Sequence, residues 1–188
     1  MRGLSAVSAL ALLGVVAVSS QANAVVLVLG GGAGSKCYAT AEFGDPFQAF
    51  DICTRALSGS EMTVRDRAAT YINRSVVRLR VHDWAGALAD TNLSIARVSN
   101  LGEAYVNRGA ALLNLNKPQD ALGDLNKAIT VGLDKVHLAY YNRGLAKEKL
   151  NDMRGAFADY KKALDLDPTF ATAADELKRF GPDGTVRS

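Results

Sequence analysis

Apolar residues recur three and four positions apart in three separate segments of the chain, residues 84–96, 119–129 and 154–164. This spacing places them on one face of an α-helix, so each segment is predicted to be an amphipathic helix. Residues 169–180 repeat the pattern with charged residues in between, and the Gly and Pro of residues 181–184 end it. The pattern therefore predicts an all-α chain.

A short phrase of the form Tyr-x-Asn-Arg followed by Ser or Gly occurs three times, beginning at Tyr71, Tyr105 and Tyr140. The interval between the tyrosines is about 34 residues, and the second interval is one residue longer than the first. Self-similarity at a period of this size indicates a solenoid of stacked supersecondary units rather than a single closed core. Solenoids usually act by presenting a surface to a partner.

Counted in units of this length, the copies share small residues at position eight and position twenty: Ser75, Gly109 and Gly144, then Ala87, Ala121 and Ala156. This pattern resembles the tetratricopeptide repeat (TPR) family over about residues 67–180. The resemblance implies a right-handed α-solenoid in which small residues let the two antiparallel helices of a unit approach. The first unit departs from it with Ser75, Thr91 and Ser94, and one extra residue separates the second and third units.

The resemblance and the turn signals divide the chain into eight parts. They are a signal peptide (1–24), a flexible Gly-rich mature N-terminus (25–34), a diverged partial TPR hairpin (35–58), TPR 1 (67–101), TPR 2 (102–136), TPR 3 (137–168), a capping helix (169–180) and a disordered tail (181–188).

The segment 1–24 has the form of a secretory signal peptide. Arg2 precedes an apolar stretch over residues 4–18, and Ala22-Asn23-Ala24 is a small-x-small cleavage sequence. Export is therefore expected, to the periplasm in a Gram-negative cell or to the outside. The alternative is an uncleaved membrane anchor, since residues 25–29 are apolar too; a membrane contact is expected only in that case.

Composition and charge exclude several functions. A net charge of +3 with 22% charged residues gives no basic surface for nucleic acid. The glycine run before Lys36 lacks the Gly directly before Lys and the Ser or Thr after it that a phosphate loop needs, so no nucleotide is expected. The two histidines, His82 and His137, have no metal-ligand spacing. We expect no metal, no cofactor and no catalytic residue.

Asn73, Asn107 and Asn142 are the main candidates for binding a partner. The resemblance places them at position six, which faces the concave groove in many TPR proteins, where an amide can both donate to and accept from a peptide backbone. The alternative is that they hydrogen-bond within the solenoid or face water. The other groove positions considered as partner-binding residues are Val76, Arg80, Val106, Ala110, Asn114, Tyr141, Leu145 and Lys149.

Two further pairings follow from spacing and context. Cys37 and Cys53 are the two cysteines of the chain, and an even count in an exported protein favours a disulfide over two buried thiols. The arginine of each repeated phrase is followed by an aspartate at a constant offset, as Arg74 is by Asp90. That offset joins position seven of the first helix to position twenty-three of the second, so a repeated Arg–Asp bridge within or between units is predicted.

These observations predict a protein without enzymatic activity that binds a protein or peptide in its concave groove. The form we favour is a scaffold or assembly factor for cell-envelope components. The alternative is a structural, self-oligomerising subunit of an envelope complex.

Overall fold

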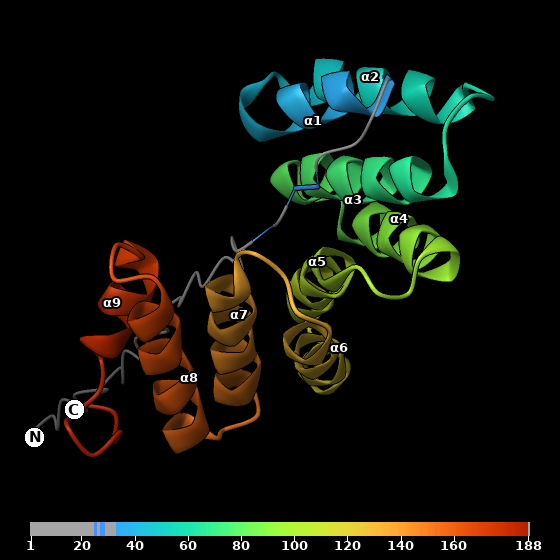
Figure 1. Cartoon of the computed structure of the whole chain (residues 1–188). Helices are drawn as coiled ribbons and strands as arrows, with labels where there is room; N and C mark the ends of the chain where they lie inside the picture. Colours follow the sequence, from blue (N-terminus) through green and yellow to red (C-terminus); the bar gives the residue numbers. More distant parts are fainter. Residues whose placement is uncertain (1–24, 26, 29–32, 188) are drawn as a thin grey trace, which may run out of the picture.

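The computed structural model describes residues 25, 27–28 and 33–187, so the predicted signal peptide over residues 1–24 lies outside the described residues. Within this part of the chain all regular elements are α-helices, apart from one isolated β-bridge (Figure 1). The helices are α1 (Ala33–Phe43), α2 (Pro46–Ser58), α3 (Val64–Arg80), α4 (Trp84–Arg97), α5 (Gly102–Asn114), α6 (Pro118–Val131), α7 (Val136–Lys149), α8 (Met153–Leu166) and α9 (Ala171–Leu177).

The helices stack in chain order into a solenoid, from α1 and α2 at one end to α8 and α9 at the other (Figure 1). Helices α1, α3, α5 and α7 each contact the next member of this set, in addition to their neighbours in sequence. Helices α2, α4 and α6 contact the helices directly before and after them. The first set therefore lines the inner, concave side of the stack, and the second set forms its outer layer.

Side-chain caps fix where several helices begin. The hydroxyl of Thr63 accepts from the backbone N–H of Asp66 at 3.0 Å, which starts α3. The carboxylates of Asp83 and Asp152 do the same for α4 and α8, each at 2.9 Å from the N–H three residues on. Because these bonds satisfy N–H groups that have no partner inside the helix, they set the register of each helical pair.

Glycine is needed where the two helices of the third unit cross. A Cβ built on Gly144 of α7 would lie 2.5 Å from Cε1 and 2.7 Å from Cδ1 of Tyr160 on α8. The ring of Tyr160 is fully buried, so it has no space to swing away. In this unit, position eight of the repeat is therefore small because an aromatic ring lies directly against the backbone; in the second unit the side chain of Leu125 lies in the same way against Gly109.

Replacing Gly144 by alanine is expected to lower the free energy of unfolding by about 1–3 kcal/mol, because the overpacking outweighs the gain in helix propensity. The matched control is Gly123→Ala on α6, where a Cβ would meet nothing within 4 Å. It should raise the stability by about 0.5–1 kcal/mol through propensity alone. Urea unfolding of both variants measures the difference; equal stabilisation by both substitutions would contradict this packing.

The C-terminal residues are ordered differently from the prediction. Residues 181–187 were expected to be a disordered tail, yet they turn back on α9. An antiparallel bridge joins Phe180 and Val186, and the N–H of Arg187 donates to the carbonyl of Arg179 at 2.8 Å. The reason is that Phe180 is only 2% exposed, against the rings of Phe157 and Tyr160. The buried ring anchors the turn that follows it.

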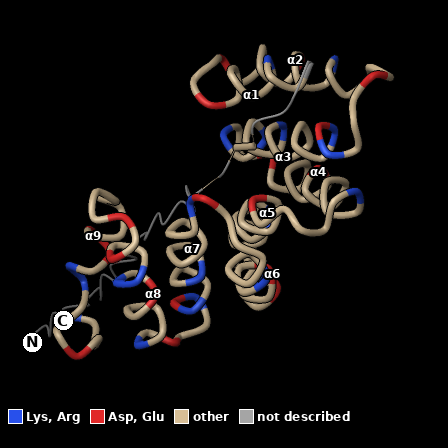
Figure 2. Tube along the Cα trace, in the orientation of Figure 1, with Lys and Arg blue, Asp and Glu red and all other residues tan. Residues whose placement is uncertain are grey.

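Charged residues of both signs are interspersed along the described helices (Figure 2). At the C-terminal end, for example, Arg179 pairs with both Glu148 and Glu176, at 2.5 and 2.6 Å. Glu148 also accepts from the hydroxyl of Tyr160, and burial, together with this carboxylate, raises the pKa of Tyr160 well above its ordinary value. Among the described residues, no helix combines the length and the apolar character that a membrane span requires.

Candidate functional site

The predicted Arg–Asp bridges are confirmed in all three units. Arg74, Arg108 and Arg143 each bind both carboxylate oxygens of the aspartate 16 residues on, with N–O distances of 2.6–2.9 Å. The hydrogen bonds to Asp124 raise the pKa of Arg108, and those to Asp159 raise that of Arg143. Each bridge ties the inner helix of a unit to its outer helix in the bidentate geometry that is strongest for this pair.

Each of these arginines also reaches the preceding unit, which the sequence interpretation missed. Nη1 of Arg108 donates to Asn92 and that of Arg143 to Asn126, both at 2.8 Å, while Arg74 reaches Thr54 at 3.2 Å. Asn92 and Asn126 occupy the same place in successive units. The repeat period could therefore have indicated that these asparagines have a common structural role. The arginines therefore join successive units as well as the two helices of one unit.

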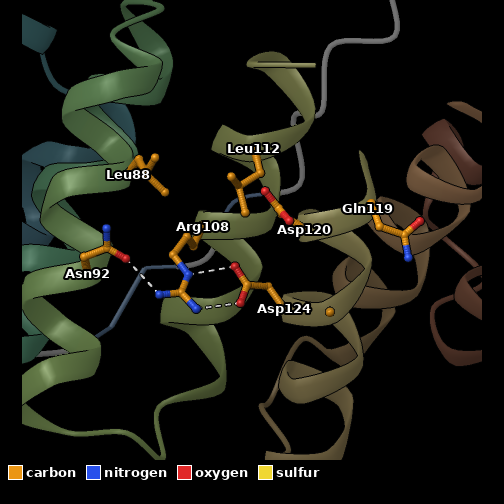
Figure 3. A pocket seen from close by; sticks show the side chains of 8 residues that line it. Leu88, Asn92, Arg108, Leu112, Gln119, Asp120 and Asp124 are labelled. Carbon is orange, nitrogen blue, oxygen red and sulfur yellow. Dashed lines mark hydrogen bonds and ion pairs between the residues drawn. The ribbon is translucent and has the colours of Figure 1, made fainter. Parts of the chain in front are cut away.

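A shallow depression of about 440 Å³ lies on the outer layer around Arg108 (Figure 3). Leu88 and Asn92 come from α4, Arg108 and Leu112 from α5, and Gln119, Asp120, Gly123 and Asp124 from α6. The guanidinium of Arg108 is committed to Asp124 and Asn92, as the dashed lines show. The depression therefore belongs to the structural connection between units.

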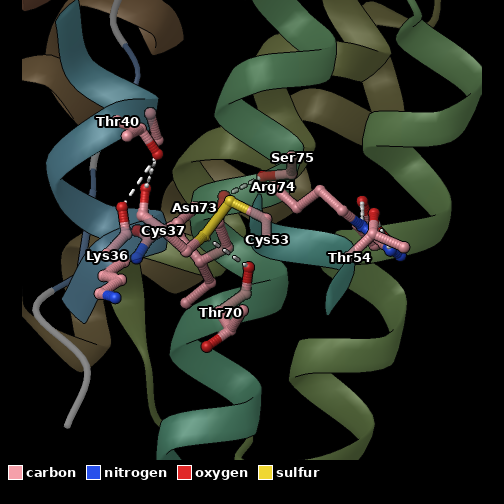
Figure 4. The surroundings of a disulfide bond; sticks show 12 residues. Lys36, Cys37, Thr40, Cys53, Thr54, Thr70, Asn73, Arg74 and Ser75 are labelled. Carbon is pink, nitrogen blue, oxygen red and sulfur yellow. Dashed lines mark hydrogen bonds and ion pairs between the residues drawn. A yellow bond between two sulfur atoms is a disulfide. The ribbon is translucent and has the colours of Figure 1, made fainter. Parts of the chain in front are cut away.

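The predicted disulfide joins Cys37 on α1 to Cys53 on α2 (Figure 4). Both residues are fully buried, and Thr70 of α3 lies beside the bridge, with its carbonyl oxygen 3.9 Å from Sγ of Cys37. The bridge therefore holds the first helical pair together against the start of the first full unit. Leu27 packs next to this pair, on the small cluster that Ala41, Ala49 and Val77 form.

On the concave side, Asn73 holds the backbone of the chain's own N-terminal segment. The N–H of Val28 donates to Oδ1 of Asn73 at 2.8 Å, and Nδ2 of Asn73 donates to the carbonyl oxygen of Val28 at 2.7 Å. A residue presents its N–H and C=O on the same side only when the chain is extended, as in a hydrogen-bonded pair of an antiparallel sheet. The amide of Asn73 thus takes the place of a neighbouring strand.

The side chains of this segment are placed on three different apolar clusters. Val28 packs on the cluster formed by Ala68, Ile72, Leu101 and Ala104, Leu27 on the cluster of α1, α2 and α3, and Val25 on the large central core. The sequence predicts a flexible N-terminus over residues 25–34, and in the structure its described residues 25, 27 and 28 lie on these clusters. The physical reason is that branched aliphatic side chains find apolar contacts on the concave face, while Asn73 satisfies the backbone.

A cavity of about 360 Å³ adjoins the segment. Its lining includes Val25, Leu27, Tyr38, Glu42, Val76, Arg80, Glu103, Asp134 and Lys135. The guanidinium of Arg80 donates to the carbonyl oxygens of Ala41 and Gly44, both at 2.9 Å, and so caps the C-terminal end of α1. Two of the predicted groove residues, Val76 and Arg80, therefore line this cavity.

The remaining predicted groove residues lie along α5 and α7. Asn107 and Asn142 are fully buried, at the positions of these helices that correspond to Asn73 of α3. Val106 and Ala110 are fully buried, and Tyr141 and Leu145 nearly so, whereas Lys149 is exposed. Asn114 donates to the carbonyl oxygen of Ala110 at 2.9 Å. Tyr141 packs edge-on against Phe170.

The described residues contain no group of three or more His, Cys, Asp or Glu side chains placed to hold a metal ion. Of the two histidines, His137 lies 3.5 Å from Asp167, and burial lowers its pKa. His82 stacks on Trp84 at the turn between α3 and α4. On the concave side of the described residues, the side-chain amide of Asn73 binds an extended backbone in the way that it would bind a peptide ligand.

Comparison with known proteins supports this architecture. Residues 137–170 match the family model described as tetratricopeptide repeat. Curated protein sequences give no match to the chain. The TPR domain of Arabidopsis OM64 is a structural neighbour with a TM-score of 0.59 and 29% identity, covering 62% of this chain and 96% of that one.

Two more distant structures share the fold. MamA from Desulfovibrio magneticus RS-1, from its residue 41 to the end, has a TM-score of 0.62 and 19% identity, covering 78% of this chain and 82% of that one. The first TPR of Spaghetti (RPAP3), bound to the HSP90 peptide SRMEEVD, has a TM-score of 0.57 and 22% identity, covering 64% of this chain and 94% of that one. Both are all-α helical-repeat structures like the chain described here.

Proposed function

Since the chain is a tetratricopeptide-repeat protein, we propose that it works without catalysis, by binding an extended segment of a partner protein in its concave groove. One observation carries this proposal. The amide of Asn73 makes both hydrogen bonds to a single extended residue, Val28. Because these bonds go to the backbone, the site recognises an extended conformation whatever the side chain on that residue is.

Two further features support a peptide as the ligand. Asn107 and Asn142 repeat the amide of Asn73 on the next two inner helices, and all three side chains are fully buried. The structural neighbours include TPR domains bound to peptides, the first TPR of Spaghetti with SRMEEVD and the second TPR of human RPAP3 with SGPTIEEVD. A groove on this fold can therefore hold a peptide.

The chemistry of the groove favours an apolar ligand over an acidic one. The two peptides bound by those neighbours both end in Glu-Glu-Val-Asp. Here the cavity beside the segment is lined by three carboxylates, those of Glu42, Glu103 and Asp134, against two cations, Lys135 and Arg80, of which Arg80 is committed to two carbonyl oxygens. An acidic peptide would face like charge, whereas branched aliphatic side chains fit the clusters that receive Leu27 and Val28.

We place this activity in an oxidising compartment of the cell envelope. The Cys37–Cys53 disulfide supports this location, because disulfides persist in the periplasm and outside the cell and are rare in the cytosol. The signal-like sequence of residues 1–24 points the same way. A scaffold or assembly factor for envelope components is the role that fits a short binding groove in that compartment.

A self-associating subunit is the second candidate, and one observation favours it. Phe43 and Phe47, at the turn between α1 and α2, are 86% and 77% exposed. Large aromatic side chains that are this open at the end of a repeat array can bury themselves against a second copy. Sedimentation velocity of the wild type and of a double variant with Phe43→Ser and Phe47→Ser separates the two functions. A peptide-binding monomer has the same sedimentation coefficient in both chains, whereas a self-associating subunit sediments more slowly in the double variant.

The test of the proposed function is a phage-displayed library of random dodecapeptides, screened against the full chain with Val28→Pro, which removes the N–H that donates to Asn73. The substitutions that follow are made in this chain. Replacing Asn73 by alanine should weaken the selected peptides between about 5-fold and 150-fold, because two neutral hydrogen bonds are lost. The matched control is Asn100→Ala, in the exposed turn before α5, which should bind as the wild type does.

A second measurement keeps the test independent of folding. N-methylation of successive peptide amides should weaken binding sharply at one position, the residue that donates to Asn73. Peptides that bind the Val28→Pro chain with equal affinity whether or not it also carries Asn73→Ala, with both chains well folded, would place the binding site elsewhere and contradict the proposal.

A further inference from the structure

The groove is occupied in the free protein by the chain's own backbone. Val28 is 45 residues from Asn73 in sequence, and the two are joined by a pair of hydrogen bonds of 2.8 and 2.7 Å. The solenoid does not need this contact for its own helices, since every inner helix already packs on its neighbours. The contact instead resembles that of a bound peptide. The backbone of Val28 is hydrogen-bonded to the side chain of Asn73, and the side chains of Leu27 and Val28 pack on separate apolar clusters.

We propose that Val25, Leu27 and Val28 form an internal ligand that competes with external peptides for the groove, and that the accepted peptides repeat its chemistry. This inference rests on the proposed function and names the ligand class: an extended segment with branched aliphatic side chains at the positions of Val25, Leu27 and Val28.

Two contacts define this chemistry. Val28 is received by the cluster of Ala68, Ile72, Leu101 and Ala104, between α3 and the start of α5. Leu27, the adjacent residue, is received on the other flank by Ala41, Ala49 and Val77 of α1, α2 and α3. Successive side chains of an extended chain point in opposite directions, so both flanks are filled at once. A peptide needs two adjacent aliphatic residues to do the same.

The tether makes the internal ligand an effective competitor. Only four residues of the sequence, 29–32, separate Val28 from the first residue of α1. A ligand tethered by a short link has an effective concentration on the order of millimolar, so an untethered peptide with equal contacts is excluded until it reaches a similar concentration. The free groove is then exposed only when Leu27 and Val28 are displaced.

The first test is amide hydrogen exchange of the full chain by NMR. The amide of Val28 should exchange at least about tenfold more slowly than an unprotected amide, because it is hydrogen-bonded to Asn73. Asn73→Ala should remove that protection while the amides of α3 and α5 stay protected. A Val28 amide that exchanges freely in the wild type would overturn the inference.

The second test uses Val28→Pro in the full chain, which removes the N–H that donates to Asn73. The control, Val28→Thr, keeps both the N–H and the shape of the side chain. The probe is a synthetic acetylated peptide with the sequence of residues 25–36, carrying a fluorophore at its C-terminal Lys. We expect the proline variant to bind the probe at least about tenfold more tightly than the wild type, and the threonine variant to match the wild type.

The outcomes separate this inference from the proposed function. Equal binding of the probe to all three chains, while library peptides bind through Asn73, would overturn the internal ligand and leave the proposed function standing. Failure of every peptide to bind any variant would overturn both. Tighter binding to Val28→Pro alone, with the loss of that binding on adding Asn73→Ala, is the result that we expect.

Discussion

Replacing Asp90 by alanine is expected to lower the free energy of unfolding by about 3 kcal/mol or more, because breaking a buried ion pair leaves an unpaired charge in the protein. Asp90 is 1% exposed and binds Arg74 with both oxygens, at 2.6 and 2.9 Å. Nε of Arg78 lies a further 2.9 Å from the same carboxylate. The guanidinium of Arg74, on a side chain only 13% exposed, would lose its carboxylate partner, while that of Arg78 would lose Asp90 and keep Asp83.

Urea unfolding followed by far-UV circular dichroism measures this loss. Asp165→Ala is the matched control, since Asp165 is exposed near the C-terminal end of α8, and a surface substitution there should change stability by no more than about 0.5 kcal/mol. A loss below about 1 kcal/mol for Asp90→Ala would show that water screens the pair as at an open surface, and the bridge would then not hold the unit together.

Removing the disulfide with Cys37→Ala and Cys53→Ala is expected to cost about 3 kcal/mol in the first helical pair, by the chain-entropy estimate for a loop of this length. Helices α1 and α2 form one end of the stack, with neighbours on one side only. The loss should therefore appear as local opening of α1 and α2, with increased hydrogen exchange there and little change in α7 and α8.

The same substitution should also release the N-terminal segment. Leu27 packs on Ala41 of α1 and Ala49 of α2, so loosening this pair removes one flank of the groove. Dithiothreitol supplies the control, because reduction should lower the stability of the wild type and leave the double alanine variant unchanged. A wild type whose exchange in α1 and α2 is unaffected by reduction would contradict a stabilising role for the bridge.

What could be predicted from the sequence is what repeats along it. The offset from Arg74 to Asp90 recurs in each unit, so the pairing of inner and outer helices followed from the period alone. The disulfide followed from the number of cysteines and the signal-like N-terminus. Each of these predictions depends on residues close in sequence or at a fixed spacing.

The occupant of the groove could not be predicted in this way. The sequence indicated that Asn73 could bind a peptide backbone, but residues 25–29 were interpreted only as an extension of the apolar signal or a flexible end. Their position depends on contacts with residues far along the chain, as far as Val77 for Leu27 and Ala104 for Val28. No period or local motif encodes such a contact. The tail after Phe180 was missed for a similar reason, since a single buried ring determines its path.

The most direct test of peptide binding in the concave groove is to locate a bound peptide by intermolecular NOEs. The complex would contain a library-selected peptide and the full chain with Val28→Pro, in which we expect the groove to be open. The predicted result is a set of NOEs from the side-chain amide protons of Asn73 to the backbone of one peptide residue, with aliphatic contacts to Ile72 and Val77 on either side. NOEs confined to the outer layer, such as the depression around Arg108 and Leu88, would contradict it.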